Sequence, residues 1–174
     1  MFLKNKLALK RPLPLLLWLL LAVLSGCGDD GNPFNEPGLR TGEIMVDING
    51  GTNRFISTGN LTADATNAYT PAARFINIYR ELPSGVYGTM VLRITSIDLD
   101  NITLPHRPSK VKVTYSPRPN EPYEAVDSEV DMEITSKEGD LLKGTFSCKV
   151  RPKGATSPSF TLTDGSFAIK LIRN

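Results

Sequence analysis

Hydrophobic and polar residues alternate along most of the chain from residue 42 onward. A period of two places successive side chains on opposite faces of a β-strand, whereas an amphipathic helix requires a period near 3.6 residues. The clearest alternating segments are 44–48, 86–94, 111–115, 126–134, 142–150 and 160–171. No amphipathic helical pattern of roughly ten residues or more occurs in this part of the sequence. The pattern therefore predicts an all-β fold.

Turn residues separate the alternating segments. Asn49-Gly50-Gly51 follows the first segment, and Asp164-Gly165 interrupts the last one. Because Asp-Gly is a strong signal for a two-residue loop, we expect a hairpin turn at Asp164-Gly165. Short strands at regular spacing, joined by turns, predict an antiparallel β-sandwich or a partly open barrel of about eight to ten strands.

The two most regular segments predict a β-hairpin between residues 125 and 150. Its apolar residues form one face, and its charged and hydroxyl residues form the other. We expect antiparallel pairing to place Glu133 opposite Lys143 and Asp127 opposite Lys149. Opposite charges across such a pair of strands contribute roughly 0.2–1 kcal/mol each.

The N-terminal part of the chain has a different pattern. Basic residues come first, followed by the apolar segment 13–24 and by Leu24-Ser25-Gly26-Cys27. Because a helix needs about 20 apolar residues to cross a bilayer, this segment is too short to span one. A basic start, a short apolar helix and a small-residue processing site are typical of a secretory signal.

The sequence Leu24-Ser25-Gly26-Cys27 resembles the lipobox of bacterial lipoproteins. In that family the cysteine sulfur is diacylated, the preceding residues are removed and the cysteine becomes the new N-terminus. The resemblance implies that residues 1–26 are a signal peptide and that Cys27 carries the lipid anchor. Two or more acyl chains hold a protein stably on a membrane, whereas one chain does so only marginally.

Removal of the signal peptide changes the composition of the chain. Residues 27–41 are rich in Gly, Pro, Asn and Asp and predict a flexible tether, and residues 42–174 predict a single all-β domain. Processing removes four of the 20 Lys and Arg residues and none of the 18 Asp and Glu residues, so the net charge changes from +2 to −2. The charge of the mature chain therefore gives no support for nucleic-acid binding.

Two acidic segments contain the candidate metal ligands. Asp127, Glu129, Asp131 and Glu133 lie on the polar face of the predicted hairpin. Residues two apart on a strand are roughly 6.5–7 Å apart. One strand therefore cannot surround a cation that needs several oxygen ligands at about 2.3–2.6 Å. Asp98-Leu99-Asp100-Asn101 lacks the glycine and the distal glutamate of a calcium-binding loop, so we expect a turn there and no metal site.

The sequence contains no recognisable catalytic set. His106 is the single histidine and is flanked by prolines, so we expect it on an exposed loop. A histidine base requires a nucleophile and an orienting partner. Cys148 lies on the apolar face of the predicted hairpin, where a buried thiol is unreactive. We therefore predict that the chain is not an enzyme and takes no cofactor.

The C-terminal half resembles uncharacterised lipoproteins of the Bacteroidota lineage, in the segments 142–147 (LKGTFS) and 160–169 (FTLTDGSFAI). The segment 48–50 also resembles the opening strand and turn of those proteins. The resemblance implies an exported all-β domain without a known activity. In that lineage Asp29 and Asp30, close to the lipidated cysteine, resemble a signal for display on the outer surface. An aspartate near this position signals inner-membrane retention in other bacteria, and we favour the outer membrane.

These observations favour a lipid-anchored envelope protein whose non-enzymatic β domain binds a protein or glycan partner. One alternative is an envelope glycan hydrolase that pairs Glu121 or Glu124 with another carboxylate, since glycosidases place two carboxyl groups about 5–9.5 Å apart. A second alternative is a carrier of a small apolar ligand, which requires a cavity of roughly 300 Å³ or more inside the sheet.

Overall fold

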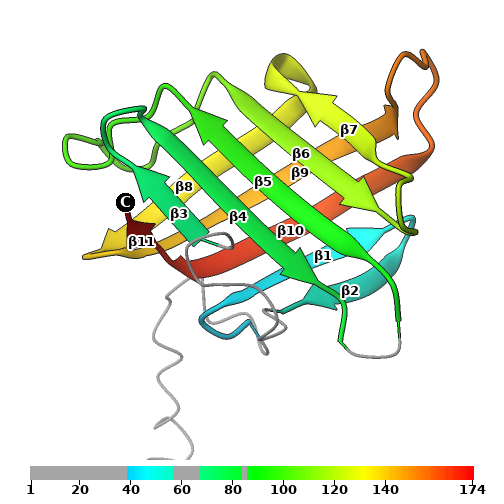
Figure 1. The fold of residues 1–174 in the computed structure, drawn as a ribbon, viewed down its shortest axis with the longest axis horizontal. Helices are drawn as coiled ribbons and strands as arrows, with labels where there is room; N and C mark the ends of the chain where they lie inside the picture. Colours follow the sequence, from blue (N-terminus) through cyan, green and yellow to red (C-terminus); the bar gives the residue numbers. More distant parts are fainter. Residues whose placement is uncertain (1–38, 57–66, 84–85) are drawn as a thin grey trace, which may run out of the picture. The chain divides into compact units, whose positions relative to one another are not determined.

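The computed structural model describes residues 39–56, 67–83 and 86–174. These residues lie within one compact unit, Glu36–Asn174. They form eleven strands and one 3-10 helix, so the all-β prediction is confirmed (Figure 1). The predicted signal peptide (1–26), Cys27 and most of the predicted tether lie outside the described residues. Within the described ranges, no helix is both long and apolar enough to cross a membrane.

The elements in chain order are β1 (Glu43–Ile48), β2 (Gly51–Phe55), β3 (Asn67–Thr70), β4 (Phe75–Glu81), β5 (Thr89–Thr95), β6 (Val111–Ser116), β7 (Tyr123–Val126), η1 (Asp127–Glu129), β8 (Val130–Glu138), β9 (Leu141–Pro152), β10 (Phe160–Lys170) and β11 (Ile172–Arg173).

The strands form one curled sheet in two layers that share β9. The hydrogen-bonded order is β11-β3-β4-β5-β6-β7-β9-β10-β1-β2, and β8 also pairs with β9. In Figure 1 the layer of β3–β7 crosses over the layer that contains β8, β9, β10, β1 and β2. A two-residue bridge between Ile56 and Glu81 joins the end of β2 to the end of β4. The sheet therefore curls back on itself as a half-barrel, in agreement with the predicted partly open barrel.

Inward-facing apolar side chains fill the space between the two layers. Alternating residues of β1, β4, β5, β6, β8, β9 and β10 are buried there. Four rings also contact in series, with centroid distances of 6.2 Å for Phe55–Tyr115, 5.2 Å for Tyr115–Phe160 and 4.8 Å for Phe160–Tyr123. Each edge-to-face pair stabilises the fold by about 0.5–1.5 kcal/mol beyond the effect of burying the rings. Because these rings come from β2, β6, β7 and β10, they join the two layers.

Residues 160–170 form one continuous strand, so the predicted hairpin at Asp164-Gly165 is wrong. Leu162 lies opposite Cys148 and Gly165 lies opposite Phe146, which leaves one extra residue in β10 as a β-bulge. Pairing with β1 shifts at the same place. Asp164 has a φ of +51°, a left-handed conformation that aspartate adopts more easily than most residues. The Asp-Gly pair forms a bulge because β1 and β9 pair with β10 on both sides of it.

Two glycines of β9 and β10 are each covered by a phenylalanine from the neighbouring strand. Gly144 lies opposite Phe167, and Gly165 lies opposite Phe146. A Cβ atom at residue 144 would meet the Glu133 carbonyl oxygen and lie 2.5 Å from the Phe167 ring. A Cβ atom at residue 165 would lie 2.5 Å from the Phe146 carbonyl oxygen. The glycines therefore allow each ring to pack directly on the adjacent backbone.

The predicted hairpin of β8 and β9 forms, but its register differs by two residues. Glu133 lies opposite Thr145 and not opposite Lys143. Asp127 belongs to η1 and does not pair with Lys149. Because a shift of two residues preserves the alternation, each strand still places its predicted apolar face in the core.

Arg80 is a buried charged residue where β4 meets the starts of β1 and β3. Its side chain is 1% exposed. Its guanidinium donates to the carbonyl oxygens of Gly42 and Tyr79 and to Asn67 Oδ1 at 2.7 Å. Asn67 Nδ2 in turn donates to the Lys170 carbonyl oxygen at 3.1 Å. Burial lowers the pKa of Arg80 to about 10. This network connects the two layers next to the bridge that closes the sheet.

Candidate functional site

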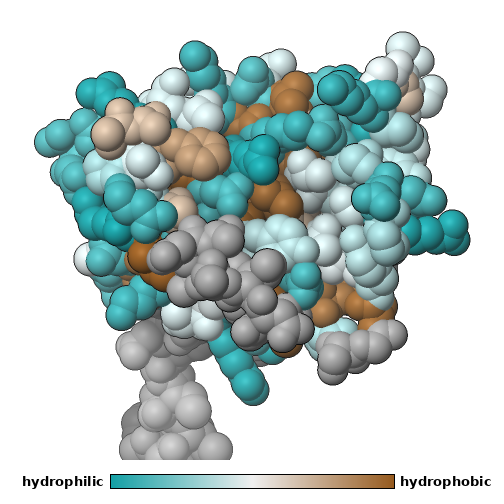
Figure 2. All heavy atoms as spheres, viewed as in Figure 1, coloured by the Kyte–Doolittle hydropathy of each residue, from teal (hydrophilic) through white to brown (hydrophobic). Residues whose placement is uncertain are grey.

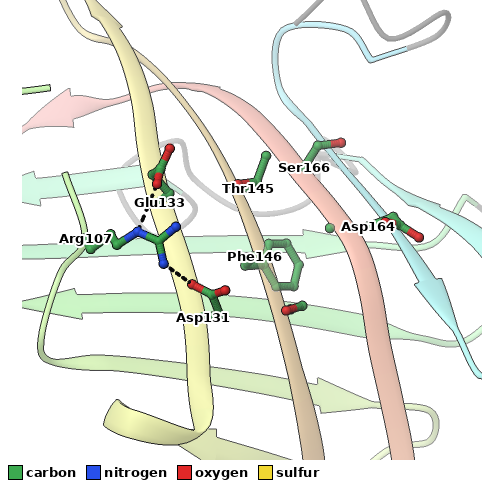
Figure 3. A pocket seen from close by; sticks show the side chains of 9 residues that line it. Arg107, Asp131, Glu133, Thr145, Phe146, Asp164 and Ser166 are labelled. Atoms are coloured by element: carbon green, nitrogen blue, oxygen red, sulfur yellow. Dashed lines mark hydrogen bonds and ion pairs between the residues drawn. The ribbon is translucent and has the colours of Figure 1, made fainter. Parts of the chain in front are cut away.

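An open groove crosses the outer face of β8, β9 and β10, opposite the core. Its volume is about 310 Å³, and we call it the polar groove (Figure 3). Its polar lining comprises Asp131 and Glu133 from β8, Thr145 and Ser147 from β9, Asp164 and Ser166 from β10, and Arg107 from the segment before β6. The groove therefore joins residues from three adjacent strands and one loop.

The strand register explains why the surface is hollow here. Glu133 lies opposite Thr145, and Thr145 lies opposite Ser166 on the next strand. Asp131 lies opposite Ser147, which faces the bulge of β10. Neighbouring strands are about 4.8 Å apart, so the outer two strands are separated by roughly 10 Å. The central strand has short hydroxyl side chains, which form the floor between longer acidic side chains.

Arg107 holds the two acids of β8. Its Nη1 lies 2.8 Å from Asp131 Oδ1, and its Nε lies 2.9 Å from Glu133 Oε2 (Figure 3). The neighbouring His106 forms two backbone hydrogen bonds with Ile134 of β8, which fix the loop beside the strand. The side chain of Arg107 is 67% exposed, so each ion pair contributes little stability. The main effect is to orient both carboxylates.

The opposite wall contains Asp164 and Ser166. The Asp164 carboxylate is exposed and points away from Asp131 and Glu133 (Figure 3). Ser166 is 7% exposed, and its hydroxyl has no hydrogen-bond partner in the described part of the chain. A buried hydroxyl without a partner costs about 1–3 kcal/mol. Ser166 is therefore a polar group beside the groove whose bonding capacity the protein does not use.

A second groove, of about 510 Å³, adjoins the polar groove and shares Asp131 and Ser147 with it. Its lining is more apolar and includes Leu162, Pro158 and Cys148. An ion pair between Glu129 and Arg151 borders it. Together the two grooves form a continuous depression over β9 and β10.

Cys148 is a free, buried cysteine, as the alternation predicts. Desolvation by burial, with a smaller effect of the Glu129 carboxylate, raises the pKa of the thiol to about 12. The thiolate is therefore scarce at neutral pH, and the thiol is a poor nucleophile.

We expect iodoacetamide to label Cys148 slowly in the folded Cys27→Ser variant. Unfolding in concentrated urea exposes the thiol and returns its pKa to about 8.5, so the labelling rate should rise more than about tenfold. Mass spectrometry of the alkylated peptide measures both rates. Equal rates in buffer and in urea would place Cys148 at an accessible surface.

The four acidic side chains of the segment 127–133 bind different partners. Asp127 Oδ1 accepts a hydrogen bond from the Val111 amide at 3.1 Å. Glu129 pairs with Arg151, and this contact holds the pKa of the Glu129 carboxyl below its usual range. Arg107 binds the other two acids. Among the described residues no cluster of three or more metal-ligating side chains occurs.

The other acidic residues considered in the sequence do not join the polar groove. Asp98 Oδ1 accepts from the Asp100 amide at 3.2 Å, and Asp98 Oδ2 accepts from Asn101 Nδ2 at 3.1 Å, which is a turn as predicted. Glu124 Oε1 lies 2.6 Å from Lys112 Nζ. Glu121 is exposed before β7. The structure therefore offers no support for an acidic pair built on Glu121 or Glu124.

The outer face of β3–β7 has a smaller hollow of about 290 Å³. Figure 2 shows hydrophilic side chains around smaller hydrophobic areas on this face. Val126, at its rim, is 43% exposed. Two of the cations in this hollow have partners, since Arg93 Nε donates to Asn77 Oδ1 at 3.0 Å and Lys112 pairs with Glu124. The polar groove remains the stronger candidate.

The sequence did not indicate Arg107, Asp164 or Ser166 as site residues. Arg107 is far from β8 in the sequence, and Asp164 lies in a segment with a strong turn signal. Ser166 follows the bulge, which is defined by pairing with two other strands. The alternation within a single strand does not show that these three residues meet in one groove.

Comparison of the chain with models of known protein families, with curated proteins and with solved structures finds no match. The function is therefore argued from the geometry and chemistry of this chain.

Proposed function

We propose that the chain is a lipid-anchored lipoprotein of the cell envelope, held on the outer membrane through Cys27. Its β domain is a non-enzymatic module that binds a protein or glycan partner in the polar groove. The observation that carries this proposal is the groove itself, where polar groups from three strands meet on the outer face of a sheet whose inner face is filled by the core.

The packing favours a binding module over a carrier of an apolar ligand. A carrier needs apolar space between the layers, and buried side chains occupy that space here. The two grooves open on the outer face of β8–β10 and combine charged, hydroxyl and apolar surface. Such a surface suits a polar partner that remains partly in solvent.

The carboxylate geometry favours binding over glycan hydrolysis. A glycosidase needs two carboxyl groups on either side of the bond to be cleaved. Asp131 and Glu133 lie on the same strand and share the guanidinium of Arg107. Asp164, on the opposite wall, points away from them (Figure 3). The groove therefore lacks a facing acid pair.

We expect the Cys27→Ser variant to lose its fatty acyl chains and leave the membrane fraction. The serine hydroxyl cannot provide the thioether that holds the diacyl group. Metabolic labelling with a fatty acid and detergent phase partitioning measure the two effects. A Cys148→Ser variant is the control and should stay acylated and membrane-bound. Unchanged partitioning of Cys27→Ser would contradict the anchor.

We expect the Thr145→Trp variant to lose partner binding, because the larger side chain fills the floor of the polar groove. The full-length protein in detergent is immobilised and exposed to envelope proteins and glycans from the producing cells. Thr114→Trp, the same substitution on the outer face of β6, is the matched control and should retain capture. If both variants capture the partner, the binding site lies outside the polar groove. Release of reducing sugar ends from the glycans would favour the hydrolase.

A further inference from the structure

We propose that the loop between β4 and β5 contacts the lipid surface of the membrane through Val86 and Tyr87, which we call the apolar tip. This inference rests on the proposed function, since the lipid anchor on Cys27 supplies that membrane. Val86 is 63% exposed and Tyr87 is 47% exposed. They are two of the three large hydrophobic residues that are exposed in the described part of the chain. Because they follow each other directly, they form one small apolar surface.

Hydrogen bonds and packing fix which side of the loop faces outward. The Leu82 amide donates to the Gly88 carbonyl oxygen at 2.8 Å, and the Val86 amide donates to the Pro83 carbonyl oxygen at 3.3 Å. The Leu82 side chain packs against the core, and a Cβ atom at residue 88 would lie 2.5 Å from its Cδ1 atom. Leu82 therefore covers Gly88 on the inner side, and the apolar tip stays exposed.

The loop carries no charge that would oppose contact with lipid. Residues 82–88 include no Asp, Glu, Lys or Arg, although these residues make up 22% of the whole chain. The adjoining acid, Glu81, accepts a hydrogen bond from the Tyr79 hydroxyl at 2.7 Å. Charged side chains enter a bilayer only at a high cost, whereas tyrosine is enriched at the membrane interface. The composition of the loop therefore suits a lipid interface.

The apolar tip lies at the end of the β domain where the chain arrives from the anchor. Arg80, near the end of β4, donates to the carbonyl oxygen of Gly42, just before β1. In Figure 1 the start of the described chain and the β4–β5 loop both lie along the lower edge of the β domain. Figure 2 shows a hydrophobic area at the corner where this loop lies. The anchor and the apolar tip therefore approach the membrane from the same end.

The length of the predicted tether keeps this end close to the membrane. Residue 39, where the described chain begins, is twelve residues after Cys27. A flexible chain of this length has a root-mean-square span of about 20 Å. A domain of this size has a radius of gyration of roughly 14 Å, so it is nearly 40 Å across. Because the tether is shorter than the domain is wide, the end near residue 39 faces the bilayer.

The small area of the apolar tip favours a lipid surface over a protein partner. Two partly exposed side chains offer roughly 200 Å², whereas each partner in a stable protein complex buries about 800 Å². A second copy joined through this loop alone would therefore dissociate. On a membrane a weak contact is sufficient, because the anchor makes the contact intramolecular, at an effective concentration of about 1 mM.

Tryptophan fluorescence tests the proposal, because the chain has a single tryptophan, Trp18, in the predicted signal peptide. The Tyr87→Trp substitution in a Trp18→Phe background makes residue 87 the only tryptophan. The acylated protein is inserted into phosphatidylcholine vesicles with or without bromine on the lipid acyl chains. We expect brominated lipid to quench the fluorescence of residue 87 about twofold, as for a ring at the interface. High salt should leave the quenching unchanged, because the loop carries no charge.

Ser157→Trp in the same background is the matched reporter control. Ser157 is exposed in the loop between β9 and β10, at the upper right of Figure 1, and brominated lipid should not quench a tryptophan there. Val86→Asp, added to the Tyr87→Trp protein, should abolish the quenching, because it places a carboxylate at the apolar tip. Its melting temperature should not change, since Val86 is 63% exposed. Val126→Asp, at the 43% exposed valine of β7, should leave the quenching unchanged.

Equal quenching at residues 87 and 157 would overturn the proposal, since the loop would then lie no closer to lipid than the opposite end. Quenching that survives Val86→Asp would also overturn it. A change in emission with envelope proteins but not with vesicles would assign the loop to a protein partner. Mass spectrometry of the acyl chains separates the two proposals. If Cys27 is acylated and residue 87 is not quenched, only the loop contact is wrong. If Cys27 carries no acyl chain, the proposed anchor fails and this inference fails with it.

Discussion

The Gly144→Ala variant is expected to lose about 3 kcal/mol of unfolding free energy. The added Cβ meets the Glu133 carbonyl oxygen on one side and lies 2.5 Å from the Phe167 ring on the other. Because the Glu133 carbonyl oxygen belongs to the backbone, rotation of a side chain cannot relieve this contact. Strands β8 and β9 must instead move apart. Urea unfolding followed by circular dichroism measures the loss.

Gly51→Ala is the matched control for this substitution. Gly51 is exposed at the start of β2. A Cβ atom added at this residue would lie 3.7 Å from its nearest neighbour, the Ile48 carbonyl oxygen. Its φ lies outside the left-handed region. The control should unfold within about 0.5 kcal/mol of the wild type. Equal stability of the two variants would show that β8 and β9 are spaced more widely at residue 144.

The Arg80→Ala variant is expected to lose about 3 kcal/mol or more of unfolding free energy. The substitution empties the volume of a side chain that is 1% exposed, and it removes the donors that bind Gly42 and Asn67. Arg93→Ala, at an exposed position on β5, is the control and should change stability by about 0.5 kcal/mol or less. If the two variants unfold at the same urea concentration, the Arg80 network does not stabilise the fold.

Alternation along the sequence predicted which face of each strand is buried, because burial on one face is a property of each strand alone. It placed Cys148 in the core, and Val111 and Val113 with it. It also extended the fifth strand too far, since Val86 is 63% exposed and β5 begins at Thr89. Val86 instead belongs to the turn between β4 and β5, where its amide donates to the Pro83 carbonyl oxygen at 3.3 Å.

Register and bulges depend on contacts between strands, which single-strand patterns do not contain. The turn of the β8–β9 hairpin has only two residues, since Glu138 pairs with Leu141, and the register shifts once more between Ile134 and Ser136. These two features moved Glu133 from its expected partner to Thr145. The same dependence hid the polar groove, which requires the register of β8, β9 and β10 together.

The backbone bridge between His106 and Ile134 also protects an edge of the sheet. An open strand edge can pair with the edge of another copy, and the proposed lipid anchor would bring copies together on one surface. On β8, the amide and carbonyl of Ile134 are already bonded to His106 at 2.8 and 2.9 Å. The loop that positions Arg107 therefore also occupies the β8 edge at Ile134, where a strand of another copy would otherwise pair.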